Sequence, residues 1–194
     1  LVLSEMLEIP LWPQLPAYTP EQMMIQYLEG LPGLRPKGNG FFIQSDSQTF
    51  DDELYAFYEE YLAVESGAVP LKNSRFAFGR ETGMTFFAFL SAMEQSGLKP
   101  RAIKGQVVGP FTLLSDLKDQ NNRSILYDDR LCDVVVKHLA MKACWQTEHL
   151  KAFRTPVIIF LDEPALAGFG SSAFISISRN RIDQILAEIV ESLQ

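Results

Sequence analysis

The sequence predicts an α/β fold in which parallel strands alternate with helices. One observation is the run Val157–Leu161, where five consecutive apolar residues follow a proline and stop at two acids. A second strand-like stretch, Ala102–Val108 (AIKGQVV), leads directly into a stretch with helical character. Short apolar runs without alternation are typical of strands covered on both faces, as in a parallel sheet. The order strand, helix, strand, helix along the chain supports the same class.

The composition indicates one globular domain without a nucleic-acid or membrane partner. The chain has 194 residues, a formal net charge of −7 and a pI near 4.9, which disfavour both kinds of anionic surface. No apolar stretch approaches the roughly 18 residues that a membrane helix needs, and no signal-peptide pattern opens the chain. Cys132 and Cys144 lie twelve residues apart on one predicted helix, too far to form a disulfide, so a reducing cytoplasm is expected.

The two ends of the sequence suggest a fragment. The chain opens with LVLSEML, already in helical pattern and without an initiator methionine, and it finishes in the helical run Ile182–Leu193. We therefore expect residues 1–194 to form a single partial domain of a longer protein.

The N-terminal part is expected to contain a helix end, a strand and a helix. Leu1–Leu7 has the pattern of a helix end, and Ile9–Trp12 that of a short strand. Thr19 is a candidate N-cap because Pro20 occupies the first helical position and Gln22 the third, so a helix is predicted from Pro20 onward.

Four further elements are expected between this helix and Ala102. Phe41–Gln44 reads as a strand or hairpin arm, and Phe76–Gly79 as a short strand. Asp51–Ser66 is predicted to be helical because its apolar residues recur three and four positions apart, and Gly67 ends the pattern. Glu81–Gln95 is predicted to be another helix.

A long helix is predicted over Asp128–Phe153, and it holds every cysteine and histidine of the chain. These are Cys132, His138, Cys144 and His149. Side chains three or four positions apart share a helix face, and no pair among these four has either spacing. The pattern therefore argues against a metal site on this helix.

Two acids follow the apolar run Val157–Leu161. Asp162 and Glu163 follow the apolar run directly, and Pro164 cannot extend a ladder because it has no N–H. In parallel α/β folds the carboxyl ends of the strands carry the ligand site. From position alone, each acid is a site candidate or merely a cap for the next helix.

The other strand end has a glycine and a proline. Gly109 and Pro110 allow a close approach of the backbone to a ligand at a helix N-terminus, or they simply turn the chain. We expect Asp162 to point into a pocket also lined by Gln106, Gly109 or Thr112, since adjacent strand ends meet at one edge. Glu163 is expected to be structural, bonding backbone or basic groups beside the site.

Two motifs resemble those of a known enzyme family. Lys104–Leu114, KGQVVGPFTLL, resembles the KG-x-x-TGPVT-x-L stretch of the catalytic domain of cobalamin-independent methionine synthase. Leu161–Leu166, LDEPAL, resembles that family's IDEPAL, and Met24–Leu28 is similar to its MVEYF helix. The GP-x-TL pattern also occurs in uroporphyrinogen decarboxylases and corrinoid-dependent methyltransferases of the same superfamily.

The resemblance implies a (β/α)8 TIM barrel with its site at the carboxyl ends of the strands, of which this chain holds only a part. It implies that Asp162 holds the amino group of homocysteine, and that a zinc ion makes the substrate thiol a thiolate. The expected function is a methyltransferase that acts on a small thiol or amino-acid acceptor. A decarboxylase-like or corrinoid-linked relative, and a barrel that binds a small molecule without turnover, are the alternatives.

The chain departs from the family in two places. The family's His-Gly-Glu turn should fall near Pro16-Ala17-Tyr18, so the glutamate that contacts homocysteine is missing. Its His-x-Cys zinc pair lies after DEPAL and is not found here, so we expect zinc ligands beyond Gln194. We further expect Val107 and Ile159 to be fully buried on neighbouring parallel strands, and open strand edges to allow self-association.

Overall fold

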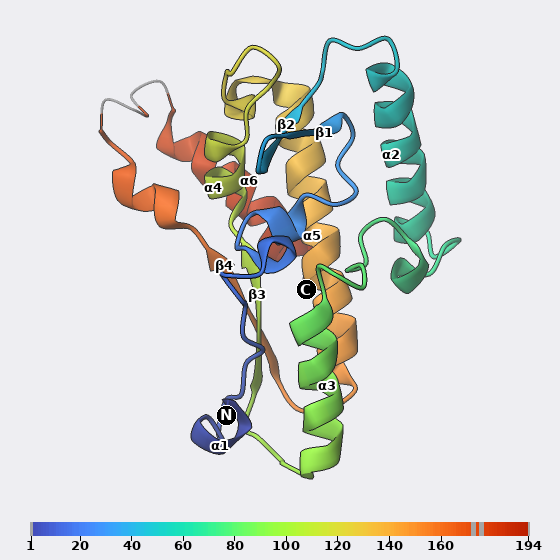
Figure 1. Ribbon diagram of the computed structural model, residues 1–194, viewed down its shortest axis with the longest axis vertical. Helices are drawn as coiled ribbons and strands as arrows, with labels where there is room; N and C mark the ends of the chain where they lie inside the picture. Colours follow the sequence, from blue (N-terminus) through green and yellow to red (C-terminus); the bar gives the residue numbers. More distant parts are fainter. Residues whose placement is uncertain (1, 172–173, 175–176, 194) are drawn as a thin grey trace.

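The computed structural model describes residues 2–171, 174 and 177–193, which form a mixed α/β structure (Figure 1). Its α-helices are α1 (Val2–Glu5), α2 (Phe50–Glu65), α3 (Met84–Ser96), α4 (Pro110–Asp116), α5 (Asp129–Lys151) and α6 (Arg179–Ser192). Its strands are β1 (Leu34–Lys37), β2 (Gly40–Ile43), β3 (Ile103–Val108) and β4 (Val157–Asp162). Short 3₁₀ helices occupy Thr19–Glu21, Ile25–Tyr27, Leu71–Asn73, Ile125–Tyr127 and Pro164–Gly168.

The predicted parallel pairing of Ala102–Val108 with Val157–Leu161 is confirmed. β3 and β4 pair in parallel over their whole length, from Ile103 opposite Val157 to Val108 opposite Asp162. On the other side of β3, Leu11 forms a parallel bridge with Lys104. The predicted strand at Ile9–Trp12 is thus reduced to one bridge, and β3 lies between two parallel neighbours.

Helix α5 covers one face of this sheet, and α6 packs on α5 (Figure 1). Asp128 caps α5 because its carboxylate accepts hydrogen bonds from the N–H groups of Arg130 and Leu131. Val107 is fully buried against this layer, as predicted. The helix predicted over Asp128–Phe153 is confirmed with slightly shorter bounds.

The expectation that both β3 and β4 are covered on both faces is wrong for β4. Ile159 is only partly buried, and on the opposite face Ile158 and Phe160 are 36% and 49% exposed. The apolar run alone did not reveal this, because an exposed face of β4 carries the same residue types as a covered one.

The smaller sheet is an antiparallel hairpin of β1 and β2, so the predicted hairpin arm at Phe41–Gln44 is confirmed. Helix α2 follows it, as expected, and ends before Gly67, which has a φ of +76°. Helix α3 is likewise confirmed, with Gly97 in the left-handed conformation beyond its last turn.

The helix predicted from Pro20 is wrong. The chain forms two separate 3₁₀ turns there, because Gln22 is extended and interrupts the helical path. Glu21 is buried, and its carboxylate accepts hydrogen bonds from the backbone N–H and the hydroxyl of Thr85, at 2.6 and 2.8 Å. This contact with the start of α3 prevails over the local helical signal.

The strand predicted at Phe76–Gly79 is also wrong. This segment is a loop whose aromatic side chains enter the core, with Phe76 against Phe57 and Phe78 against Trp12. Its apolar pattern reflects these core contacts.

The described strands form two sheets of two strands and close no barrel. No helix among the described residues is both long and apolar enough to cross a membrane.

Candidate functional site

The two family-like motifs meet at the carboxyl ends of β3 and β4. Gly109 follows β3 and begins the turn into α4, while Glu163 follows β4. The Gly109 N–H donates a hydrogen bond of 2.7 Å to the carbonyl of Asp162, so the two strand ends stay joined beyond the sheet. Sequence segments about fifty residues apart therefore form one edge (Figure 1).

Glu163 is bound to the start of α4, which confirms its expected structural role. Its carboxylate accepts hydrogen bonds from the N–H of Phe111 at 2.9 Å, and from the N–H and hydroxyl of Thr112 at 2.7 and 2.6 Å. Gly109 is required beside it, since a Cβ there would lie 2.0 Å from Glu163 Cδ. Burial raises the pKa of Glu163, and the hydrogen bonds from Thr112 and Phe111 oppose that rise.

Asp162 is partly buried, and its carboxylate accepts no hydrogen bond from the residues that the structure describes. Burial raises its pKa, and the nearby charge of Lys104 acts in the opposite direction. Because side chains alternate along a strand, the register places Asp162 on the same face as Phe160 and Gln106. The pKa of buried Tyr27 is raised first by burial and then by the charge of Asp162.

Gln106 is held through its backbone. Its carbonyl accepts hydrogen bonds from the hydroxyl of Tyr27 at 2.7 Å and from Nε2 of Gln146 at 2.8 Å. Its N–H donates to Oε1 of Gln146 at 3.2 Å, so the side-chain amide of Gln146 pairs with β3 as a neighbouring strand would. Trp12 also donates to Gln146. Sequence reasoning missed Tyr27 and Gln146; a glutamine on the apolar side of α5 was the available signal.

The four expected substrate-binding residues therefore come together only in part. Gln106, Gly109, Thr112 and Asp162 all lie at the same end of the sheet. The Thr112 hydroxyl and the space beside Gly109 are taken by Glu163, whereas Asp162 shares its face with Gln106. Asp162 is the charged residue of this set, and its carboxylate remains available to a ligand.

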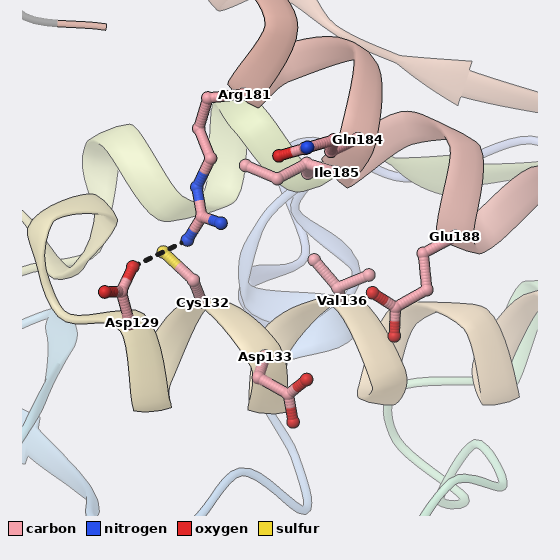
Figure 2. A pocket seen from close by; sticks show the side chains of 8 residues that line it. All are labelled: Asp129, Cys132, Asp133, Val136, Arg181, Gln184, Ile185 and Glu188. Carbon is pink, nitrogen blue, oxygen red and sulfur yellow. Dashed lines mark hydrogen bonds and ion pairs between the residues drawn. The ribbon is translucent and has the colours of Figure 1, made fainter.

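A hollow of about 270 Å³ lies elsewhere, between α5 and α6 (Figure 2). Its lining is Asp129, Cys132, Asp133, Val136, Arg181, Gln184, Ile185 and Glu188. Arg181 reaches across from α6 to pair with Asp129 at 2.8 Å (Figure 2). Lys137 joins Asp133 and Glu188 at 2.6 and 3.0 Å. The charges around this hollow are paired with one another, as expected at a junction between two helices.

The described residues do not fit a zinc ion. No three His, Cys, Asp or Glu side chains among them converge in a way that could hold a metal. The candidates on α5 are engaged separately: the ring of His138 contacts the Tyr27 carbonyl, His149 contacts the Trp145 carbonyl, and Cys144 donates to Ser192. The zinc that the resemblance implies therefore has no ligand set within the described part of the chain.

Helix α5 also carries a buried lysine that sequence reasoning missed. Lys142 is fully buried, and its Nζ has no hydrogen-bond partner among the described residues. Nζ lies 5.2 Å from the ring centroid of Phe78. Burial lowers the pKa of Lys142 to about 8, and the charge of Glu29 opposes that shift. Neighbouring His138 is likewise buried with Nδ1 unpartnered, and burial followed by the charge of Lys142 lowers its pKa.

Comparison of the chain with models of protein families, with curated proteins and with solved structures finds no match.

Proposed function

We propose that this chain belongs to a (β/α)8 barrel methyltransferase of the methionine-synthase type, and that its Asp162 binds the amino group of a small amino-acid substrate. The observation that supports this most is the contrast between two adjacent acids. Glu163 is saturated by hydrogen bonds from α4, whereas the carboxylate of Asp162 accepts none from the described residues. Asp162 is the acid at this strand end that is left for a ligand.

The chemistry of such a site is a charge-assisted pair. An ammonium group donates to a carboxylate in short, strong hydrogen bonds, and partial burial strengthens them because fewer water molecules compete. Asp162 is partly buried, and the charge of Lys104 favours its ionised form. A small thiol-containing amino acid such as homocysteine is the proposed substrate. The described residues bind and orient it, and the zinc ion that would activate its thiol finds no ligand set among them.

Three features support the barrel. β3 is flanked on both sides by parallel neighbours, α5 covers one face, and the other face of β4 shows Ile158 and Phe160 to solvent. Parallel sheets are normally covered on both faces, so the face with uncovered Ile158 and Phe160 suits the interior of a barrel completed by further strands or by a second copy of the chain. Two free cysteines suit a reducing, cytoplasmic setting.

A second candidate is a barrel that binds an amino acid without transferring a methyl group. The absence of a glutamate near Pro16-Ala17-Tyr18, where the resembling family carries the one that contacts homocysteine, favours it. Both candidates require the same binding site, so a methyl-transfer assay of the completed barrel, with homocysteine as acceptor, separates them once binding is established.

The binding site is tested by calorimetric titration of the 194-residue chain with homocysteine. We expect Asp162→Asn to weaken binding roughly tenfold or more, since a charge-assisted hydrogen bond contributes about 1.5–3 kcal/mol. Asp183→Asn is the matched control, because Asp183 is an exposed acid on α6 that faces only Arg179 at 3.8 Å. Equal affinities of the wild type and Asp162→Asn would refute the role of Asp162.

A further inference from the structure

A second charged group lies on the face of the sheet that carries Asp162. Lys104 pairs with Ile158 in the register of β3 and β4, so alternation places Lys104, Phe160 and Asp162 on one face. Nζ of Lys104 lies 4.1 Å from the ring centroid of Phe160. The amine is therefore directed along the sheet toward the strand ends, over the aromatic residue that precedes Asp162 by two positions.

The two opposite charges share one face of the sheet but do not contact each other. Lys104 is the charged group that favours the ionised form of Asp162, yet the two side chains form no ion pair or hydrogen bond with each other. Among the described residues, Nζ of Lys104 donates no hydrogen bond and the Asp162 carboxylate accepts none. An ammonium has three donors and a carboxylate about four acceptor sites, so Asp162 can still accept hydrogen bonds from a ligand, and Lys104 can still donate them beside its contact with Phe160.

We propose that Lys104 binds the carboxylate of the ligand whose amino group Asp162 binds, so that the pair selects free α-amino acids. This inference rests on the proposed function and adds the group that recognises the second charge of the substrate. An α-amino acid carries its ammonium and carboxylate on one carbon, and a zwitterion placed between Lys104 and Asp162 meets an opposite charge at each end.

Phe160 adds a preference for the side chain of the ligand. Its side chain is 49% exposed, its ring lies under the Lys104 amine, and it precedes Asp162 by two positions on the same face. Aromatic rings contact thioether and thiol sulfur favourably, typically with the sulfur about 5 Å from the ring. The surface formed by Lys104, Phe160 and Asp162 therefore suits a sulfur-containing amino acid better than a strongly polar one.

The experiment compares three ligands that differ by one charged group each. Homocysteine carries both charges, 3-aminopropane-1-thiol lacks the carboxylate, and 4-sulfanylbutanoate lacks the amine. Lys104→Met removes the charge but keeps an apolar side chain of similar length over Phe160. Lys99→Met, at an exposed lysine, is the matched control, and circular dichroism with thermal unfolding verifies that each variant folds.

We expect Lys104→Met to weaken homocysteine roughly tenfold to a hundredfold and to leave 3-aminopropane-1-thiol unchanged. Asp162→Asn should weaken homocysteine and 3-aminopropane-1-thiol, and leave 4-sulfanylbutanoate unchanged. An equal loss of both amines in Lys104→Met, or no loss, would show that Lys104 only covers Phe160 and would overturn this inference alone. Failure of the wild-type chain to bind any of the three ligands would overturn the proposed function as well.

Discussion

Replacing the buried Lys142 by methionine should stabilise the protein at neutral pH. The folded state holds the pKa of this amine at about 8, against the ordinary 10.5. That difference corresponds to about 3 kcal/mol by which burial disfavours the charged form. Methionine has a similar length without the charge, and it forfeits the contact with Phe78, which contributes about 0.5–2 kcal/mol. We therefore expect a net gain of about 1–3 kcal/mol in the free energy of unfolding at pH 7.

The pH dependence distinguishes this cause from simple repacking. Between about pH 8 and 10.5 the unfolded chain binds more protons at Lys142 than the folded chain, so stability rises with pH in that window. Below pH 8 the amine is charged in both states and the full destabilisation remains. The advantage of Lys142→Met should thus be constant near neutral pH and should shrink as the pH approaches 10.5. Shifts from groups that Lys142 does not influence, such as Tyr27, cancel in the difference between the two proteins, and His138, whose pKa is lowered by burial and by the charge of Lys142, changes its protonation only below neutral pH.

Urea unfolding followed by tryptophan fluorescence measures this difference, since Trp12 and Trp145 are both buried. Lys151→Met, at an exposed lysine near the end of the same helix, serves as the control and should change stability by less than about 0.5 kcal/mol. A Lys142→Met variant that is less stable than the wild type at pH 7, or whose advantage does not depend on pH, would refute the reasoning.

Two further predictions concern the strand ends and the edge of β3. Glu163→Ala should cost about 1–3 kcal/mol because three donors lose their acceptor. Gly109→Ala should cost a similar amount through its clash with Glu163, and urea unfolding should show that the double variant loses less than the sum of both; additive losses would contradict the contact. Gln146→Leu should cost at least about 2 kcal/mol and should speed hydrogen exchange at the Gln106 amide; unchanged exchange would disprove the pairing.

The pairing of β3 with β4 was predictable because short apolar runs without alternation are favoured in parallel strands. The partial exposure of Ile159 was not predictable, because the burial of a strand residue depends on which elements lie over the strand, and the sequence pattern does not reveal them. The failed helix after Pro20 shows a related limit. Glu21 bonds to Thr85, which lies sixty-four residues away, and no local signal announces such a contact.

The candidate site was predictable to the same degree. The position of Asp162 at a strand end followed from the boundary of the apolar run, and the structural role of Glu163 followed from its place beside a helix start. Lys142 was missed for a physical reason. Its neighbours on α5 are apolar, but a lysine in such a pattern is normally exposed through its long side chain, and only the packing of Phe78 over it shows otherwise.

The pairing of Gln146 with Gln106 restricts the edge of the sheet to which a further strand can be added. An unpaired strand edge accepts a strand from another molecule, which leads to ordered assembly or to aggregation. Where the segment around Leu11 leaves β3, the Gln146 amide already occupies the N–H and carbonyl that an incoming strand would need. Strand addition is therefore directed to β4, at the opposite side of the sheet. Any filament or dimer built through this sheet should depend on β4, and a proline placed there should prevent it while leaving the β3 side unaffected.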